Sequence, residues 1–154
     1  MVPYGGLADI SLRPGETIVI APATGSFGGA AVKVALAMGA RVLAMGRNRG
    51  ALEKIAATHQ RIEAVPITGD LQADLKSLQS FGTIDAYFDI SPVEAANSTH
   101  FKSCILALRH GGRASFMGGL GGADLAIPIR AVVRTCSSGA NGCTPIKMSK
   151  ISSR

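Results

Sequence analysis

Short apolar runs alternate with helix-like segments along most of this 154-residue chain. The apolar runs predict strands at 17–21, 41–45, 62–67, 83–90 and 113–117, and the segments between them predict helices at 26–38, 48–59, 71–78 and 92–108. The first run, 17–21, is apolar at nearly every position, which is typical of a strand buried on both faces. The alternation therefore indicates an α/β fold, a doubly wound parallel sheet of about five strands with helices on both sides.

Composition narrows the class of protein. Apolar residues make up 47% of the chain and charged residues 17%, so most of the chain is predicted to fold around a core. Its apolar runs are too short to cross a membrane, and the first residues lack the basic and apolar regions of a signal peptide. Three cysteines do not make a disulfide framework. We therefore expect a cytoplasmic protein with no membrane partner.

The net charge of +6 is unevenly distributed. Residues 131–154 contain four basic residues and no acidic one, whereas 1–130 are nearly balanced. The basic segment lacks interleaved aromatic residues, so no specific nucleic-acid partner is expected. Periodicity also fades there. We expect a nucleotide-binding domain at 1–133 and a basic, Ser- and Gly-rich tail at 134–154 that is poorly ordered.

A glycine-rich loop follows the first predicted strand. Residues 23–28 read Ala-Thr-Gly-Ser-Phe-Gly, an A-x-G-x-x-G pattern between a strand and a helix. In this context Gly25 lets the backbone approach a pyrophosphate, and Gly28 lets the helix pack closely against the strand. The predicted dinucleotide contacts in this loop are Ala23, Gly25, Ser26, Phe27 and Gly28.

Other interpretations of this loop are weaker. It could be a glycine turn without a ligand. Residues 24–28 also loosely match a hydrolase nucleophile elbow around Ser26, but that site needs an acid and a histidine from a longer chain. A short-chain dehydrogenase would need a Tyr-x-x-x-Lys pair, and the residues four positions after Tyr4 and Tyr87 are Ala8 and Ser91.

The end of the second predicted strand indicates which dinucleotide is preferred. An NAD site places a carboxylate about 20 residues beyond the glycines, to bind the ribose 2′-hydroxyl. Here the corresponding residue is Gly46, followed by Arg47 and Asn48. Glycine leaves room for a 2′-phosphate and a guanidinium can bind it with two hydrogen bonds, so these residues favour NADP (NADPH). The alternative is that Arg47 is an ordinary solvated loop cation.

Several stretches together resemble a known family. They are Tyr-Gly-Gly-Leu at 4–7, Leu-Arg-Pro-Gly-Glu-Thr at 12–17, the glycine loop, Ala-Leu-Ala-Met-Gly-Ala at 35–40 and Leu-Arg-His-Gly-Gly-Arg at 108–113. In this combination and order, residues 3–133 resemble the cofactor domain of medium-chain dehydrogenases/reductases, the superfamily of zinc-type alcohol dehydrogenases and quinone oxidoreductases. The resemblance implies a Rossmann fold and NAD(P)-dependent hydride transfer. It also implies contacts to the adenosine phosphate by Arg47 and Asn48, and to the ribose and nicotinamide by Ile90, Ser91, Gly118 and Gly119.

The chain departs from that family in two respects. The family's catalytic half precedes its cofactor domain, and this sequence starts at the join between the halves. The family's sheet also continues into a sixth strand, which we do not expect here. We therefore expect an oxidoreductase domain that is inactive alone, with a non-catalytic nucleotide-binding or interaction remnant as the alternative. An open sheet edge after the fifth strand would promote homo-oligomers.

Other reactive side chains have ordinary interpretations. Cys104 lies in an apolar segment and is expected in the core. The six-residue spacing of Cys136 and Cys143 is poor for zinc, so no metal is expected. The histidines at 59, 100 and 110 are expected at the surface or at helix ends, and Asp85 and Asp89 at the two ends of the fourth strand. Asp89 would lie at the ligand-binding end. We assign no catalytic residue.

Overall fold

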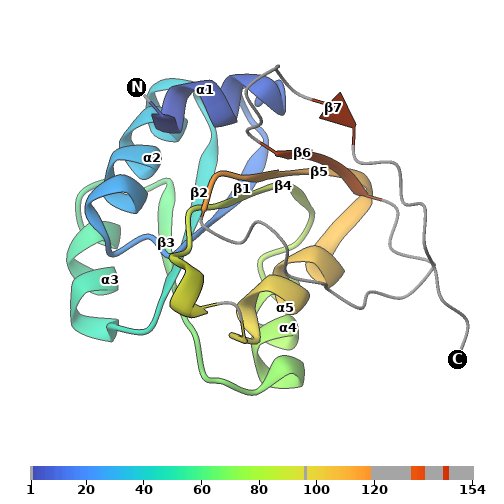
Figure 1. Cartoon of the computed structure of the whole chain (residues 1–154). Helices are drawn as coiled ribbons and strands as arrows, with labels where there is room; N and C mark the ends of the chain where they lie inside the picture. The colour runs from blue at the N-terminus through green and yellow to red at the C-terminus, as the bar shows by residue number, and fades with distance from the viewer. Residues whose placement is uncertain (1, 96, 119–132, 138–143, 146–154) are drawn as a thin grey trace, which may run out of the picture.

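The computed structural model describes residues 2–95, 97–118, 133–137 and 144–145, the last two ranges by their backbone alone (Figure 1). The elements in chain order are α1 (Val2–Asp9), β1 (Thr17–Ala21), α2 (Ser26–Ala37), β2 (Arg41–Gly46), α3 (Arg49–Ala56), β3 (Ile62–Pro66), α4 (Leu71–Gln79), β4 (Ile84–Asp89), the 3-10 turn η1 (Val93–Ala95), α5 (His100–Ala107), β5 (Leu108–Phe116), β6 (Val133–Ser137) and β7 (Thr144–Pro145). The predicted α/β fold is confirmed, and all five predicted strands are present.

The described strands form a seven-stranded sheet in the order β3-β2-β1-β4-β5-β6-β7. Neighbours from β3 to β6 are parallel, and β7 is antiparallel to β6. The chain leaves β1 towards β2 on one side and later returns to place β4 on the other side. In open parallel sheets, ligands bind beside such a reversal, outside the carboxyl ends of the strands.

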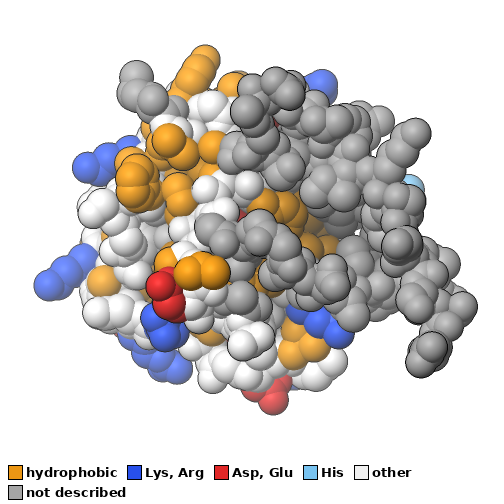
Figure 2. Space-filling view, viewed as in Figure 1, with side chains coloured by type: hydrophobic (Ala, Val, Ile, Leu, Met, Phe, Trp, Pro, Cys, Tyr) orange, Lys and Arg blue, Asp and Glu red, His pale blue; other side chains and the backbone are white. Residues whose placement is uncertain are grey.

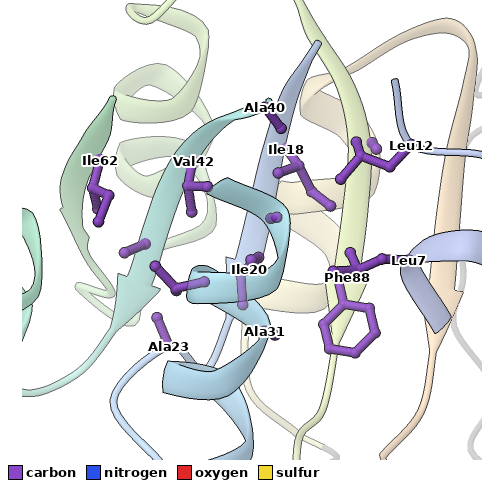
Figure 3. Close-up of a cluster of buried hydrophobic side chains, with 14 of the residues drawn as sticks. Leu7, Leu12, Ile18, Ile20, Ala23, Ala31, Ala40, Val42, Ile62 and Phe88 are labelled. Atoms are coloured by element: carbon purple, nitrogen blue, oxygen red, sulfur yellow. The ribbon is translucent and has the colours of Figure 1, made fainter. Parts of the chain in front are cut away.

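Helices cover both faces of this sheet. Alternate residues of β1 point to opposite sides, so Ile18 and Ile20 pack with α1, α2 and α3, whereas Val19 packs with α4 and α5. Figure 3 shows the first of these cores, where Leu7 from α1 and Ala31 from α2 approach the sheet residues. Because β1 and β2 are buried on both sides, they carry apolar runs without polar alternation.

Two predicted boundaries are wrong. The helix predicted at 92–108 begins only at His100, after η1. Its expected first turns contain Asn97, Ser98 and Thr99, whose side chains compete for backbone hydrogen bonds and disfavour helix interiors. The strand predicted at 113–117 begins earlier, at Leu108, so residues 110–112 lie inside β5. There the register passes from Ile84 opposite Leu108 to Ala86 opposite Arg113, and the extra residues bulge out.

Three elements were not predicted, namely α1, β6 and β7. Helix α1 contains adjacent glycines and has no clear apolar period, so propensity argued against it. The expectation that no sixth strand follows β5 is also wrong, because β6 pairs in parallel with β5 along residues 112–116. The sequence of β6, Val-Arg-Thr-Cys-Ser, contains no run of apolar residues, which explains why little in the sequence indicates it. The open edge predicted after β5 is therefore covered.

No helix among the described residues is long and apolar enough to cross a membrane. The remainder of the predicted 134–154 tail, outside β6 and β7, lies outside the described residues.

Candidate functional site

A cavity of about 1400 Å³ opens at the carboxyl ends of β1, β2, β4 and β5. Five loop regions line it, and the lining residues are Pro22, Thr24, Gly25, Ser26, Phe27, Gly28, Arg47, Asn48, Ile67, Ile90, Ser91, Pro92, Glu94, Ala95, Asn97, Ser98, His100, Met117 and Gly118. This is the end of the sheet at which the order of the strands reverses about β1. The cavity therefore lies where open α/β sheets bind ligands.

Backbone hydrogen bonds hold the floor of the cavity. Each loop continues the sheet ladder by one bond beyond its strand: Ala23 N–H donates to Met45 O at 2.8 Å, Ile67 to Gly46 O at 2.8 Å, Ile90 to Ala21 O at 3.0 Å, and Met117 to Asp89 O at 2.8 Å. The loops therefore leave the sheet from fixed positions, which sets where their side chains lie.

The N-terminus of α2 opens onto this cavity. Gly25 is its N-cap, and no side chain caps the helix. The first helical bond in this turn runs from Gly29 N–H to Gly25 O at 2.8 Å, so the amides of residues 26–28 precede the intrahelical ladder. The first turn contains no acidic residue. These amides and the helix dipole therefore present partial positive charge to the cavity.

The two glycines of the motif differ in what surrounds them. A Cβ atom on Gly28 would lie 2.0 Å from the carbonyl oxygen of Pro22, which is impossible without moving backbone. A Cβ atom on Gly25 would meet nothing within 4 Å. Gly28 is thus required for helix–strand packing, whereas Gly25 keeps open a space that belongs to the cavity.

The β2–α3 junction supplies the cationic side of the cavity. Arg47 is exposed, and Asn48 caps α3 by accepting a hydrogen bond from Ala51 N–H at 3.0 Å. Arg47 makes no ion pair with any residue of the described part of the chain. Figure 2 shows Lys and Arg side chains spread along the side of the molecule that carries α2 and α3. This side is suited to an anionic group.

Gly46 lies further back than the sequence suggested. It is buried, and a Cβ atom there would approach Thr24 Cγ2 at 3.2 Å and Leu52 Cδ2 at 3.4 Å. Gly46 therefore packs behind the glycine loop. It approaches Thr24, which lines the cavity, but does not line the cavity itself.

A buried polar network forms the opposite side of the cavity. Asp89, at the end of β4, is fully buried and accepts hydrogen bonds from Tyr87 Oη at 3.1 Å, Ser91 Oγ at 2.7 Å and Ser91 N–H at 3.2 Å. Ser91 Oγ also lies 3.0 Å from His100 Nε2, and His100 Nδ1 lies 2.6 Å from Ser98 Oγ. The network joins the end of β4 to the start of α5.

A second buried carboxylate fixes the start of α5. Asp74 of α4 accepts hydrogen bonds from Thr68 N–H at 2.9 Å, Thr68 Oγ1 at 2.7 Å and Thr99 Oγ1 at 3.3 Å. It therefore links the β3–α4 loop to the residue that precedes His100.

Burial raises the pKa values of two further groups next to this network. It raises the pKa of the Tyr87 phenol well above 10.0, with the nearby Cys104 and Asp89 adding to the effect. Burial likewise raises the pKa of the Cys104 thiol well above 9.0, assisted by Asp89 and Asp74. Both groups therefore stay neutral near pH 7. The prediction of Cys104 as a core residue is confirmed, since it is free, buried and in contact with Met45.

Most of the predicted contact residues meet at the cavity. Those that line it are Gly25, Ser26, Phe27, Gly28, Arg47, Asn48, Ile90, Ser91 and Gly118. Ala23 and Gly46 are buried behind it, and Gly119 lies outside the described residues. Gly118 approaches the β4 loop so closely that a Cβ atom would lie 2.1 Å from Ser91 O.

Sequence reasoning missed the role of His100. The expected place at a helix end is confirmed, since His100 is the first residue of α5, but it is 2% exposed and reaches Ser91 and Ser98. Asp85 also differs from Asp89, because it pairs with Arg109 at 2.7 Å and accepts from Thr17 N–H, at the far end of β4. The polar run Asn97-Ser98-Thr99 before an apolar segment was the one available signal.

Comparison with solved structures shows the same fold in several oxidoreductases. The chain is similar to the quinone oxidoreductase of Thermus thermophilus (24% identity, TM-score 0.69, covering 91% of this chain and 44% of that chain). It is similar to the alcohol dehydrogenase TADH of Thermus sp. ATN1 (24% identity, TM-score 0.68, 89% of this chain and 40% of that chain). It also matches the nucleotide-binding subdomain of the enoylreductase domain of PpsC from Mycobacterium tuberculosis (20% identity, TM-score 0.69, 90% of this chain and 77% of that subdomain).

These likenesses confirm the predicted Rossmann-type fold. The chain spans about two fifths of the length of the quinone oxidoreductase and the alcohol dehydrogenase. No protein-family model and no curated protein matches the sequence.

Proposed function

We propose that this chain binds a nicotinamide dinucleotide, NADP in preference to NAD, as the cofactor domain of a medium-chain dehydrogenase/reductase. The observation that carries the proposal is the uncapped N-terminus of α2, which opens onto a large cavity beside the strand reversal. Backbone amides in that position bind phosphate groups in many nucleotide-binding folds.

The residues present fit such a cofactor. Gly25 leaves open the space that a pyrophosphate needs next to the helix, and Gly28 lets α2 come within reach of the β1 loop. No acidic side chain lies in the first turn of α2, where a carboxylate would repel phosphate. Among the described residues that line the cavity, Glu94 is the one carboxylate, and it lies on η1.

The two sides of the strand reversal then define the two ends of the cofactor. The adenosine half would lie over β2, where Arg47 can bind a 2′-phosphate and Ile67 offers an apolar surface. The nicotinamide half would lie over β4 and β5, against Ile90, Ser91 and Gly118. When bound, the nicotinamide supplies hydride transfer.

The chain's own residues would hold and orient that cofactor. The ladder bonds of Ile90 and Met117 fix the loops on the nicotinamide side. The Asp89–Ser91–His100 network fixes the Ser91 side chain within them. Three observations support membership of the family. They are the motifs that occur in the family's order along the sequence, the shared fold, and a Thermus thermophilus neighbour described in complex with NADPH.

Dinucleotide binding without turnover is the second candidate. Both ring nitrogens of His100 are engaged by serines, and the Glu94 side chain is exposed. The described cavity residues therefore offer no free buried group that could exchange a proton with a substrate. Quinones, enones and alcohols, supplied with NADPH or NADP⁺, test this candidate by the absorbance of the reduced nicotinamide.

The test of binding is calorimetric titration of the 154-residue chain with NADPH and NADH. We expect saturable binding of both and tighter binding of NADPH. Absence of binding by either nucleotide would overturn the proposal, and equal affinities would overturn the preference for NADP.

A further inference from the structure

The carboxylate of Asp89 is a buried negative charge at the nicotinamide side of the cavity. Its three hydrogen-bond donors are the Tyr87 hydroxyl, the Ser91 hydroxyl and the Ser91 amide, all of them neutral groups. Neutral donors hold a carboxylate in place, but they leave its net charge uncompensated. Because Asp89 is directly bonded to Ser91, which lines the cavity, this charge acts on whatever occupies that end.

His100 is the cation-forming group nearest to this carboxylate. Its Nε2 atom lies 3.6 Å from Asp89 Oδ1. Since the Ser91 hydroxyl donates to Asp89, His100 Nε2–H donates to Ser91 Oγ. At the other ring nitrogen, Ser98 Oγ can donate to a neutral ring or accept from a protonated one. The ring is therefore held by a serine at each nitrogen.

Few other charges compete at this place. The titratable groups on the neighbouring elements are Tyr87 of β4, Asp74 of α4, Lys102 and Cys104 of α5, and Glu94 of η1. Burial keeps Tyr87 and Cys104 neutral through their raised pKa values. The cations of β5 pair elsewhere, Arg109 with Asp85 and Arg113 with Glu16. Asp89 is the buried carboxylate bonded directly to the cavity-lining Ser91.

We propose that Asp89 makes this end of the cavity selective for the oxidised, positively charged nicotinamide ring over the reduced, neutral ring. The inference rests on the proposed function. The oxidised and reduced cofactors differ by one charge on the ring and are otherwise alike. A nearby buried charge therefore acts on the ratio of their affinities more than on either affinity alone.

The experiment measures the affinities of NADP⁺ and NADPH for the 154-residue chain at about pH 8. The 2′-phosphate is common to both forms and cancels in the ratio of the two affinities. We expect NADP⁺ to bind more tightly than NADPH. The NAD⁺ and NADH pair should behave alike.

Asp89→Asn tests the source of the charge. At about pH 8 it should lower the relative affinity for NADP⁺ severalfold, because the variant removes the buried unit charge that favours the cationic ring. Glu94→Gln is the matched control, because it removes an exposed carboxylate from the same cavity. Its effect should stay below about twofold, since water screens an exposed charge.

His100→Gln removes the neighbouring ring without removing Asp89. The glutamine can still donate to Ser91, so the selectivity for NADP⁺ should persist. If Asp89→Asn does not fold, the wild-type ratio decides the matter. Equal affinities of the wild type for NADP⁺ and NADPH, or a folded Asp89→Asn protein with an unchanged ratio, would overturn the inference while leaving dinucleotide binding intact. Failure of every nucleotide to bind would instead overturn the proposed function, and this inference with it.

Discussion

The two sides of the cavity are built in different ways. On the α2 and α3 side, contiguous loops present backbone amides and the exposed Arg47. On the β4 and α5 side, Asp89 and Ser91 at the end of β4 meet His100 at the start of α5, and all three are buried. The first side can hold a ligand through groups that are available before binding. The second side has its polar groups already paired with one another.

The two sides of the cavity are therefore expected to act on a ligand in different ways. A side made of free amides and a free cation is suited to phosphate groups, whose charge it can meet directly. A side made of a satisfied buried network holds one geometry firmly and acts on a ligand through its field. Mutations on the two sides should therefore differ in how they change ligand binding and the free energy of unfolding.

Replacing Gly28 should have the largest effect. In Gly28→Val the new Cβ atom would lie 2.0 Å from Pro22 O, so α2 has to move away from the β1 loop. We expect the free energy of unfolding to fall by about 3 kcal/mol and dinucleotide binding to disappear. Urea denaturation followed by circular dichroism measures the first effect. Wild-type stability in this variant would show that α2 does not depend on this close approach.

Replacing Gly25 should separate binding from stability. Its φ and ψ of −82° and 168° suit any residue, and a Cβ atom would meet nothing within 4 Å. Gly25→Val should therefore keep the wild-type free energy of unfolding to within about 0.5 kcal/mol. It should weaken NADPH binding by about 100-fold, because the side chain enters the space assigned to the pyrophosphate. Wild-type affinity for NADPH in this variant would show that the loop is a simple turn with no role in binding.

Removing Arg47 should affect one cofactor only. A charge-assisted hydrogen bond contributes about 1.5 to 3 kcal/mol, so Arg47→Ala should weaken NADPH binding by about 10- to 100-fold and leave NADH binding nearly unchanged. Lys33→Ala controls for net charge, because Lys33 is an exposed residue of α2 that does not line the cavity. Equal losses for NADPH in both variants would mean that general charge, and not Arg47, attracts the phosphate.

The smallest predicted effect concerns alkaline stability on the β4 side. The pKa values of Cys104 and Tyr87 are raised in the folded chain above their ordinary values of 9.0 and 10.0. Above pH 9 the unfolded chain therefore releases protons that the folded chain retains, which favours unfolding. The free energy of unfolding should be unaffected by these groups below that pH and fall by about 1 kcal/mol per pH unit above it.

Urea denaturation between about pH 8 and about pH 10 measures this slope. Cys104→Ala should flatten the first part of it. A wild-type free energy of unfolding that stays constant across the range would show that the thiol and phenol are more accessible to water than their burial indicates.

The sequence predicted the first side of the cavity well and the second side poorly. The glycine loop and Arg47 each follow directly after a strand. Because the carboxyl ends of parallel strands lie at one end of the sheet, their positions at the cavity could be predicted from the sequence. His100 was misjudged because its burial depends on α5 starting only after residues 97–99 and on packing against β4. Such tertiary packing produces no periodic pattern in the sequence.

The same contrast explains the outcomes for the strands. The central β1 and β2 are buried on both faces and carry apolar runs, so their positions were predicted to within a residue. β6 lies between β5 and β7, and its residues, Val-Arg-Thr-Cys-Ser, contain no apolar run. The buried central strands can therefore be recognised from the sequence, whereas β6 cannot.

Calorimetric titration of the chain with NADPH, alongside the Gly25→Val variant, tests the central claim most directly. The account predicts saturable binding at a single site in the wild type and a loss of about 100-fold in the variant, whose fold stays intact by circular dichroism. No binding by the wild type, or equal binding by both proteins, would contradict the assignment of the cavity at the N-terminus of α2 as a dinucleotide site.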